Sequence, residues 1–348
     1  MFNTYSVGPL TIAPALVLAP MSGVTTSAFR RLIKELNPGA VGLVITEFIS
    51  VEAMTRQVPR TLAMMKYVLD ERPFGIQIFG HDITRMRDSA RMCEDAGSDI
   101  VDINCGCPAP KVVKKGGGCE LMRQPEHLAQ ILKAVRSAIS VPLTMKFRSG
   151  WDAQNLNALE IAKIAESEGV NAITIHGRTR SQLYRGEADW SIIQEVKETV
   201  NIPVLGSGDV TDRESAELRL QFGADGIFIG RAALSNPFVF SDIVNGTKTK
   251  LRSEPLKAVQ VLERYIELLK EEFSPKASVG KVKQLCSQMC CGLEWRKPIL
   301  VSESLLRQED LLRETRFTLE DRSASKVCTD AAIESAENDL SSLNVPLD

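Results

Sequence analysis

Short apolar runs alternate along the chain with segments whose apolar residues recur every three or four positions. Eight runs have the length of a strand, at residues 16–21, 43–48, 74–80, 100–104, 143–148, 172–176, 202–206 and 226–230. The segments between them have the spacing of amphipathic helices, at residues 25–37, 83–96, 125–139, 156–168, 190–200 and 213–222. This alternation predicts an α/β fold with a parallel sheet.

The number and spacing of these units favour a closed barrel over an open sheet. Eight β/α units fill about 230 residues, close to the roughly 250 residues of a (β/α)8 barrel. A doubly wound open sheet is the competing architecture. Polar residues follow nearly every predicted strand at its carboxyl end, where a barrel carries its site. We therefore predict a (β/α)8 TIM barrel.

After Gly230 the alternation stops and only helical spacing continues. Residues 255–273 and 279–293 place apolar side chains three and four positions apart, and residues 299–312 are also rich in apolar side chains. Residues 246–316 contain 14 Lys and Arg against 10 Asp and Glu, whereas residues 317–348 contain 2 against 7. We predict a barrel at 1–245, an appended all-helical basic domain at 246–316, and an acidic tail at 317–348 that is partly disordered or loosely helical.

Composition narrows the class of protein. The 348 residues are 44% hydrophobic and 25% charged, which excludes a disordered or fibrous chain. A net charge of −2 means that any polyanionic partner must use a local patch. Residues 13–21 form an apolar run too short for a membrane helix, and eight Cys without a secretory signal are typical of reduced thiols. We expect a cytoplasmic monomer with no membrane association and, with three His, no metal centre.

The last two predicted strands end in sequences that suit a phosphate group. They are Gly206-Ser207-Gly208-Asp209 and Gly230-Arg231. Glycines let backbone N–H groups approach an anion closely, and the loops after strands seven and eight commonly hold a phosphate in barrels. Together the two loops predict a phosphate-bearing cofactor.

Three other strand residues indicate which cofactor this is. Lys146 and His176 stand at the carboxyl ends of apolar strands, and Gln77 lies in the third strand. A cation beside a flavin would stabilise the negative charge that develops on reduction, and an amide can pair with donor and acceptor atoms of the ring. The alternatives are a solvated charge for Lys146 and a packed or capping imidazole for His176.

Several motifs in the same order resemble one family, the flavin-dependent tRNA-dihydrouridine synthases, and in particular its bacterial B-type members. The string VDINCGCP begins at Val101 and is followed by a Gly-rich segment at 116–118. The other motifs are APMSGVTTSAFR, IQIFG, MKFRSGW, TIHGRTRSQLYRGEADW and IGRAAL. The similarity covers residues 8–240.

This resemblance implies an FMN-binding barrel that reduces the C5=C6 bond of particular uridines in tRNA, with NADPH as the source of hydride. It implies that FMN is bordered or contacted by Pro20, Met21, Ser22, Gln77, Lys146 and His176, with the phosphate end at Ser207, Gly208, Asp209, Gly230 and Arg231. It implies that Cys107 is the proton donor. The family usually has Asn at the position of Ser207, so one amide contact is lost here.

The chemistry explains why a thiol suits this position. Hydride delivered to C6 of uracil leaves an enolate that must be protonated at C5. A thiol with an ordinary pKa of about 8.5 is mostly protonated near neutrality, yet acidic enough to give up its proton. An inert buried thiol is the alternative for Cys107. Lys111, Lys114 and Lys115 follow it and would supply positive charge for RNA phosphates, unless they are only a solvated loop.

Two further groups of cysteines have plainer interpretations. Cys105 stands where the family more often has an apolar residue, and a disulfide to Cys107 in so tight a ring would be strained. Cys286, Cys290 and Cys291 have no second Cys pair or His at ligand spacing, so we interpret them as core thiols. In the helical domain, RNA binding would rest on Tyr265, Lys281, Lys283, Trp295, Arg296 and Lys297.

Two other functions compete with tRNA reduction. An FMN barrel acting on a free pyrimidine or an enone would need the catalytic loop but no basic helical domain. A tRNA-binding or folding factor with a vestigial flavin would not need both Cys107 and Lys146. The sequence favours the tRNA-modifying enzyme, because it carries all of these features together.

Overall fold

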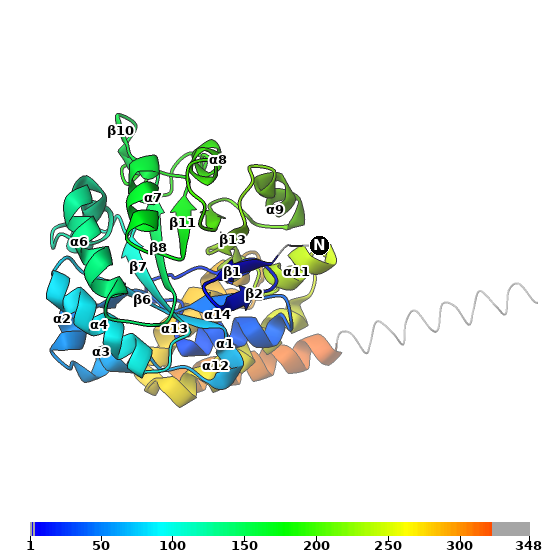
Figure 1. Ribbon diagram of the computed structural model, residues 1–348. Coiled ribbons are helices and arrows are strands. Elements are labelled where there is room, and N and C mark those ends of the chain that lie inside the picture. Colours follow the sequence, from blue (N-terminus) through cyan, green and yellow to red (C-terminus); the bar gives the residue numbers. More distant parts are fainter. Residues whose placement is uncertain (1, 3, 322–348) are drawn as a thin grey trace, which may run out of the picture. The chain divides into compact units, whose positions relative to one another are not determined.

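The computed structural model describes residues 2 and 4–321 (Figure 1). By their internal contacts, the described residues up to Thr249 form one compact unit, and a second unit begins at Lys250. Most of the acidic tail predicted at 317–348 lies outside the described residues. Residues 317–321 are helical, so the last helix continues beyond the boundary that we placed at residue 316.

Eight parallel strands of the first unit close into a barrel. In chain order they are β3 (Leu16–Leu18), β4 (Leu43–Ile45), β6 (Phe74–Phe79), β7 (Ile100–Cys105), β8 (Leu143–Arg148), β11 (Ala172–His176), β12 (Val204–Ser207) and β13 (Gly226–Ile229). Each strand pairs with the next, β13 pairs with β3, and a short β5 (Ile49–Ser50) also pairs with β6. This closure confirms the TIM barrel and excludes the open sheet.

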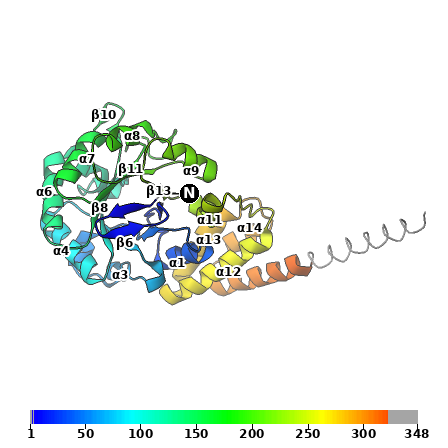
Figure 2. The same cartoon turned by 45° about the vertical axis from the view of Figure 1, so that its right-hand side comes forward.

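The six predicted helices all form on the outside of this barrel, as Figures 1 and 2 show. They are α1 (Ser27–Leu36), α4 (Ile83–Asp95), α6 (Pro125–Arg136), α7 (Ala158–Ser167), α8 (Ser191–Lys197) and α9 (Arg213–Leu220). Their apolar faces are buried; in α6 these residues are Leu128, Ile131, Leu132 and Val135, at intervals of three, one and three. The parallel strands between them are buried on both faces.

Shorter elements fill the connections, and the sequence pattern did not predict them. They are α2 (Val51–Thr55), α3 (Pro59–Ala63), α5 (Pro110–Val113), α10 (Ala232–Ser235) and α11 (Val239–Asn245), with 3-10 turns η1 (Leu69–Glu71) and η2 (Gly118–Arg123). A helix of four to seven residues is too short to establish a period. A hairpin of β9 (Gly150–Asp152) and β10 (Asn155–Leu156) was missed for the same reason.

An amino-terminal hairpin closes one end of the barrel. It is formed by β1 (Tyr5–Val7) and β2 (Leu10–Ile12), drawn in dark blue in Figure 1. Its buried side chains share one apolar cluster with the first residues of β4, β7 and β11. Because this hairpin occupies the amino end of the strands, the carboxyl end remains for a ligand.

The second unit is helical, as predicted. It contains α12 (Pro255–Glu272), α13 (Pro275–Met289), α14 (Arg296–Val301) and a helix at residues 305–321. Cys286 and Cys290 are fully buried one helical turn apart, whereas Cys291 is exposed. Over the described ranges, no three His, Cys, Asp or Glu side chains gather in a way that could hold a metal ion.

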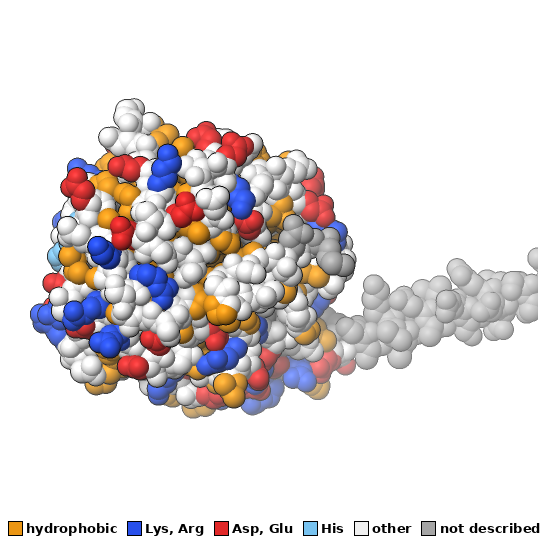
Figure 3. Space-filling model, viewed as in Figure 1, with side chains coloured by type: hydrophobic (Ala, Val, Ile, Leu, Met, Phe, Trp, Pro, Cys, Tyr) orange, Lys and Arg blue, Asp and Glu red, His pale blue; other side chains and the backbone are white. Residues whose placement is uncertain are grey.

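Two further observations concern membrane-spanning helices and surface charge. None of its described helices combines the length and the apolar character needed to cross a membrane. On the face shown in Figure 3, Lys and Arg side chains are interspersed with Asp and Glu.

Candidate active site

Two loops at the carboxyl end of the barrel offer backbone N–H groups to an anion. They follow β12 and β13, and within the described chain the N–H groups of Gly208, Asp209, Gly230 and Arg231 donate no hydrogen bond. Gly208 has a φ of +131°, and a Cβ there would lie 2.5 Å from Ala188 Cβ, so only glycine fits. These unpaired donors suit a phosphate group.

Gly206 has a different role from the one that its sequence position predicted. It belongs to β12, and a Cβ at this position would lie 2.0 Å from the ring of Trp190. The Trp190 indole N–H donates to Gly208 O at 3.1 Å. Gly206 therefore makes room for the tryptophan that supports the loop, and it does not face a ligand.

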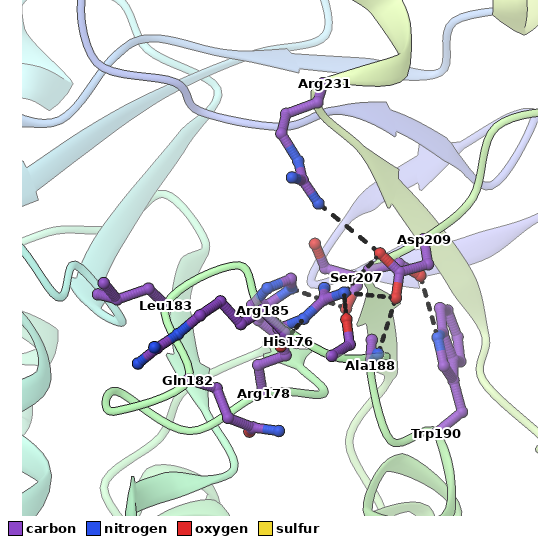
Figure 4. A network of polar contacts seen from close by, with 12 residues as sticks. His176, Arg178, Gln182, Leu183, Arg185, Ala188, Trp190, Ser207, Asp209 and Arg231 are labelled. Carbon is purple, nitrogen blue, oxygen red and sulfur yellow. Dashed lines mark hydrogen bonds and ion pairs between the residues drawn. The ribbon is translucent and has the colours of Figure 1, made fainter.

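Asp209 joins this loop to two arginines (Figure 4). Arg178 Nη2 donates to both of its carboxylate oxygens at 2.8 and 2.7 Å, and Arg231 lies at 3.7 Å. Burial raises the pKa of Asp209, but the hydrogen bonds from Arg178 and the Ala188 amide outweigh this and lower it overall. An ionised Asp209 would therefore orient Arg231 and would not itself meet a phosphate.

Arg178 was not among the predicted site residues. It is 2% exposed, and its Nη1 is buried without a hydrogen-bond partner among the described residues. The available signal was its position two residues beyond β11, at the carboxyl end of a barrel strand.

His176, at the end of β11, keeps one ring nitrogen for a ligand. Its Nδ1 lies 2.9 Å from Ser207 O, so Nδ1 carries the proton and Nε2 is an acceptor. Nε2 is buried and has no partner within the described chain. Burial, with the nearby charges of Lys146 and Arg148, lowers the pKa of His176 to about 2, so the ring is neutral.

Lys146 is an unpaired cation near this imidazole. It lies in β8 and is half-buried, and its ammonium makes no hydrogen bond or ion pair with any described residue. Burial and the neighbouring Arg148 lower its pKa to about 8, partly offset by the charge of Asp102. At neutral pH the ammonium is still mostly protonated, so it can stabilise negative charge on a ligand.

Gln77 is held inside the protein more firmly than we expected. It is fully buried, its Nε2 donates to Asp102 Oδ2 at 2.5 Å, and its Oε1 accepts from Asn104 Nδ2 at 2.8 Å. One amide hydrogen and one oxygen lone pair remain for a ligand. Asp102 and Asn104 were not predicted as site residues, although both stand in the VDINCGCP motif.

Cys107 lies in the loop after β7 and is 9% exposed. Burial raises the pKa of its thiol, against the opposing effects of the Ala109 amide and Arg148. The thiol is therefore protonated at neutral pH, as a proton donor must be, whereas a nucleophilic Cys needs a lowered pKa. Cys105 is fully buried within β7, on the opposite face of the strand from Asn104.

Arg148 and Cys119 support this loop. Arg148 Nε donates to Gly106 O at 2.9 Å, and its Nη1 donates to Thr179 O and Leu183 O. The Cys119 amide donates to Cys107 O at 3.1 Å, and burial raises the pKa of the Cys119 thiol to about 12. Sequence reasoning did not assign Arg148 or Cys119 to the site.

The loop after β3 brings the remaining predicted residues to the same end of the barrel. A Cβ built on Gly230 would lie 3.6 Å from Met21 Sδ, so Met21 borders the last loop. Pro20 is half-buried beside it, and Ser22 is exposed. The fold and site together define a (β/α)8-barrel protein with an anion cradle, an unpaired lysine and a buried, protonated thiol at one mouth.

Comparisons with known proteins agree with this class. The family model of dihydrouridine synthase (Dus) matches residues 17–318. The tRNA-dihydrouridine synthase B of Pseudomonas syringae pv. tomato is 42% identical over 68% of this chain and 70% of its own. The tRNA-dihydrouridine synthase B of Pseudomonas putida is 41% identical over 74% of this chain and 75% of its own. A probable tRNA-dihydrouridine synthase of Rickettsia conorii is 41% identical over 76% of this chain and 80% of its own.

The chain belongs to the dihydrouridine synthase family. The family that its motifs resemble is therefore confirmed.

The buried carboxyl of Asp102 predicts an unusual dependence of stability on pH. Burial raises its pKa from 3.8 to about 6, although hydrogen bonds from Thr144 and Gln77 oppose the shift. The folded state then binds this proton more tightly than the unfolded state, so its contribution to stability falls as pH rises from about 4 to 6. Relative to Asp102→Asn, the wild type should lose about 2.4 kcal/mol of unfolding free energy between pH 4 and 7.

Urea unfolding of both proteins at the two pH values measures this difference. Asp212→Asn is the control, because hydrogen bonds from Ser215 lower the pKa of Asp212. For that pair the wild type should gain relative stability as pH rises. A difference between wild type and Asp102→Asn that stays constant with pH would contradict the raised pKa.

Proposed function

We propose that this protein reduces the C5=C6 bond of specific uridines in tRNA to 5,6-dihydrouridine, using FMN and NADPH. The observation that carries the proposal is one mouth of the barrel. It combines a buried, protonated Cys107 thiol with the Lys146 ammonium and His176 Nε2, which have no partner among the residues described. The relatives named above are tRNA-dihydrouridine synthases, which favours a uridine in tRNA over other substrates.

The residues at this mouth fit FMN. The unpaired N–H groups of Gly208, Asp209, Gly230 and Arg231, with the Arg231 guanidinium, would hold its phosphate. Lys146, the free His176 Nε2 and the remaining donor of Gln77 would contact its ring, bordered by Pro20, Met21 and Ser22. Ser207 contributes its backbone carbonyl, which fixes the tautomer of His176. When bound and reduced by NADPH, FMN would supply hydride to C6 of the uracil.

Cys107 would complete the reaction at the neighbouring carbon. Hydride addition at C6 leaves negative charge on the uracil, and the Cys107 Sγ–H delivers the proton that C5 needs. Burial keeps this thiol protonated until that charge develops. Lys146 supplies positive charge near the reacting groups, and the Arg148 bond to Gly106 O holds the thiol's loop in place.

The target uridine would have to leave its stack to reach this buried site. RNA phosphates would meet Lys111, Lys114 and Lys115, which are exposed and make no ion pair with a described residue. In the helical unit, α13 carries Lys276, Lys281 and Lys283 and no acidic residue. A free pyrimidine or an enone would need neither group of lysines.

Several aromatic and basic residues expected to bind RNA in the helical unit serve its packing. Tyr265 is 2% exposed, Lys281 lies 4.5 Å from the centre of the Phe273 ring, and Arg296 donates to Ser287 O. Lys297 is exposed, and Lys283 and Trp295 are half-buried. We therefore base the RNA contact of this unit on the charge of α13.

The purified protein should be yellow and contain noncovalent FMN. Lys146→Ala should weaken FMN binding or slow flavin reduction by NADPH by about tenfold or more, because it removes the cation from the ring site. Absorbance spectra, FMN titration and stopped-flow reduction measure these effects. Lys163→Ala, on the exposed side of α7, is the control and should behave as the wild type. A protein that contains no flavin and takes up none would refute the site.

Cys107→Ala should separate the two halves of the reaction. Reduction of the flavin by NADPH does not need a proton on uracil C5, so its rate should stay within about twofold of the wild-type rate, whereas dihydrouridine formation should fall by about 10² or more, as on loss of a general acid. Cys105→Ala is the matched control and should keep most activity. If Cys107→Ala formed dihydrouridine at the wild-type rate, another group would have to be the proton donor.

Reversing charge on α13 should weaken tRNA binding. Lys276→Glu with Lys283→Glu should lower affinity and reduce the slope of log Kd against log salt by about 1.5, from two lost phosphate contacts. Lys133→Glu with Lys163→Glu makes the same change in net charge on α6 and α7, where both lysines are exposed. Equal losses of tRNA affinity in the two double variants would show a general effect of net charge. In that case α13 would not be part of the RNA interface.

A further inference from the structure

A chain of hydrogen bonds crosses the barrel interior from β8 to the loop of Cys107. Thr144 Oγ1 donates to Asp102 Oδ1 at 2.6 Å, and Gln77 Nε2 donates to Asp102 Oδ2 at 2.5 Å. Asn104 Nδ2 donates to Gln77 Oε1 at 2.8 Å. The Cys107 amide donates to Asn104 Oδ1 at 2.9 Å. The chain thus links three neighbouring strands to the backbone of the proposed proton donor.

Barrel register places these groups side by side. Gln77 of β6 pairs with Asp102 of β7, and Asp102 pairs with Thr144 of β8. Gln77, Asp102 and Asn104 are 0%, 1% and 7% exposed. Water therefore cannot easily replace any member, and each hydrogen bond that fails would leave a buried polar group unpaired.

The chemistry of its ends allows this chain only one direction. An ionised Asp102 can only accept, so Gln77 must turn its NH2 toward it and its oxygen toward Asn104. Asn104 then turns its NH2 toward Gln77 and its oxygen toward the loop. The loop offers only donors there, the amides of Gly106 at 3.2 Å and Cys107 at 2.9 Å. Asp102 at one end and the loop amides at the other therefore require the same orientation of the Gln77 and Asn104 side chains.

We propose that Asp102 and Asn104 are positioning residues, which hold the Cys107 thiol in place through this one-directional chain. The inference rests on the proton-donor role proposed above. Neither residue needs to touch the reacting atoms. Their task is to fix the loop, because a thiol must lie within hydrogen-bond reach of the carbon that it protonates, and a displacement of about 1 Å can cost about 10²-fold in rate.

Asn104→Asp tests the direction of the chain. Carboxylates would then stand on both sides of Gln77, and in either orientation its oxygen would face one of them. We expect tRNA-dependent reoxidation of the reduced flavin to slow by about tenfold or more. Alkylation of Cys107 by iodoacetamide, read by mass spectrometry, should change severalfold as the loop shifts, and stability to urea should fall.

A second substitution should repair the first. In Asp102→Asn with Asn104→Asp the whole chain can reverse, because the amide introduced at position 102 can donate to Gln77, and Gln77 can donate to the new carboxylate. That carboxylate still accepts from the amides of Gly106 and Cys107, and Thr144 still has an acceptor. The double variant should recover most of the reoxidation rate, the alkylation rate of Cys107 and the stability.

Asn37→Asp is the matched control. Asn37 is 1% exposed and bridges Ile33 O, Pro237 O and the Ser241 amide, away from this chain. It should lose stability, keep its Cys107 alkylation rate, and gain nothing from Asp102→Asn. The positioning role is overturned if Asn104→Asp leaves Cys107 alkylation and reoxidation unchanged, if the double variant recovers neither, or if Asp102→Asn also repairs Asn37→Asp.

Failure of the proposed function gives a different result. A wild-type protein that forms no dihydrouridine in tRNA would refute that function. Alkylation of Cys107 and unfolding by urea require neither tRNA nor turnover. Their rescue pattern in the double variant therefore decides whether the chain positions Cys107, whatever reaction the thiol serves.

Discussion

Closure of the barrel by the pairing of β13 with β3 is the constraint on which the site depends. Phe228 pairs with Val17, and the pairing brings Gly230 beside Met21, more than two hundred positions earlier in the chain. Because all eight strands are parallel, their carboxyl ends meet at one mouth. The amino-terminal hairpin packs against the opposite end, so the site residues from different strands gather at a single mouth.

Burial at this mouth then sets the charge of each group. The same loss of water keeps the Cys107 thiol protonated and the His176 ring neutral, and lowers the pKa of Lys146 to about 8. Each shift favours the uncharged form, because a low-dielectric interior penalises charge. The same penalty applies to the charge of Asp102, because even two hydrogen bonds do not bring the pKa of its buried carboxyl back to the usual value. The reaction proposed for this site, which moves a hydride and a proton, would use neutral donors and acceptors held in fixed directions.

The sequence predicted much of this arrangement and missed a definable part. Eight apolar runs corresponded to the eight barrel strands, and residues next to strand ends, such as Lys146, His176 and Cys107, do lie at the mouth. Asp102 and Asn104 were not predicted as site residues, because the sequence does not show which residue a polar side chain inside an apolar strand will pair with. Gly206 was misjudged, since its neighbour Trp190 lies sixteen positions away and meets it only in the folded barrel.

The sequence by itself therefore determined the order and type of the main strands and helices, the family and the chemical groups available for a reaction. Those properties are local, because hydrophobic periodicity and motif spacing depend on neighbours along the chain. Only the tertiary structure decided which groups pair with one another, and so which remain free for a ligand. Arg178 pairs with Asp209, and Gln77 pairs with Asp102 and Asn104, while the Lys146 ammonium pairs with no residue in the described part of the chain. Such pairing depends on strand register and burial, which join residues that are distant in sequence.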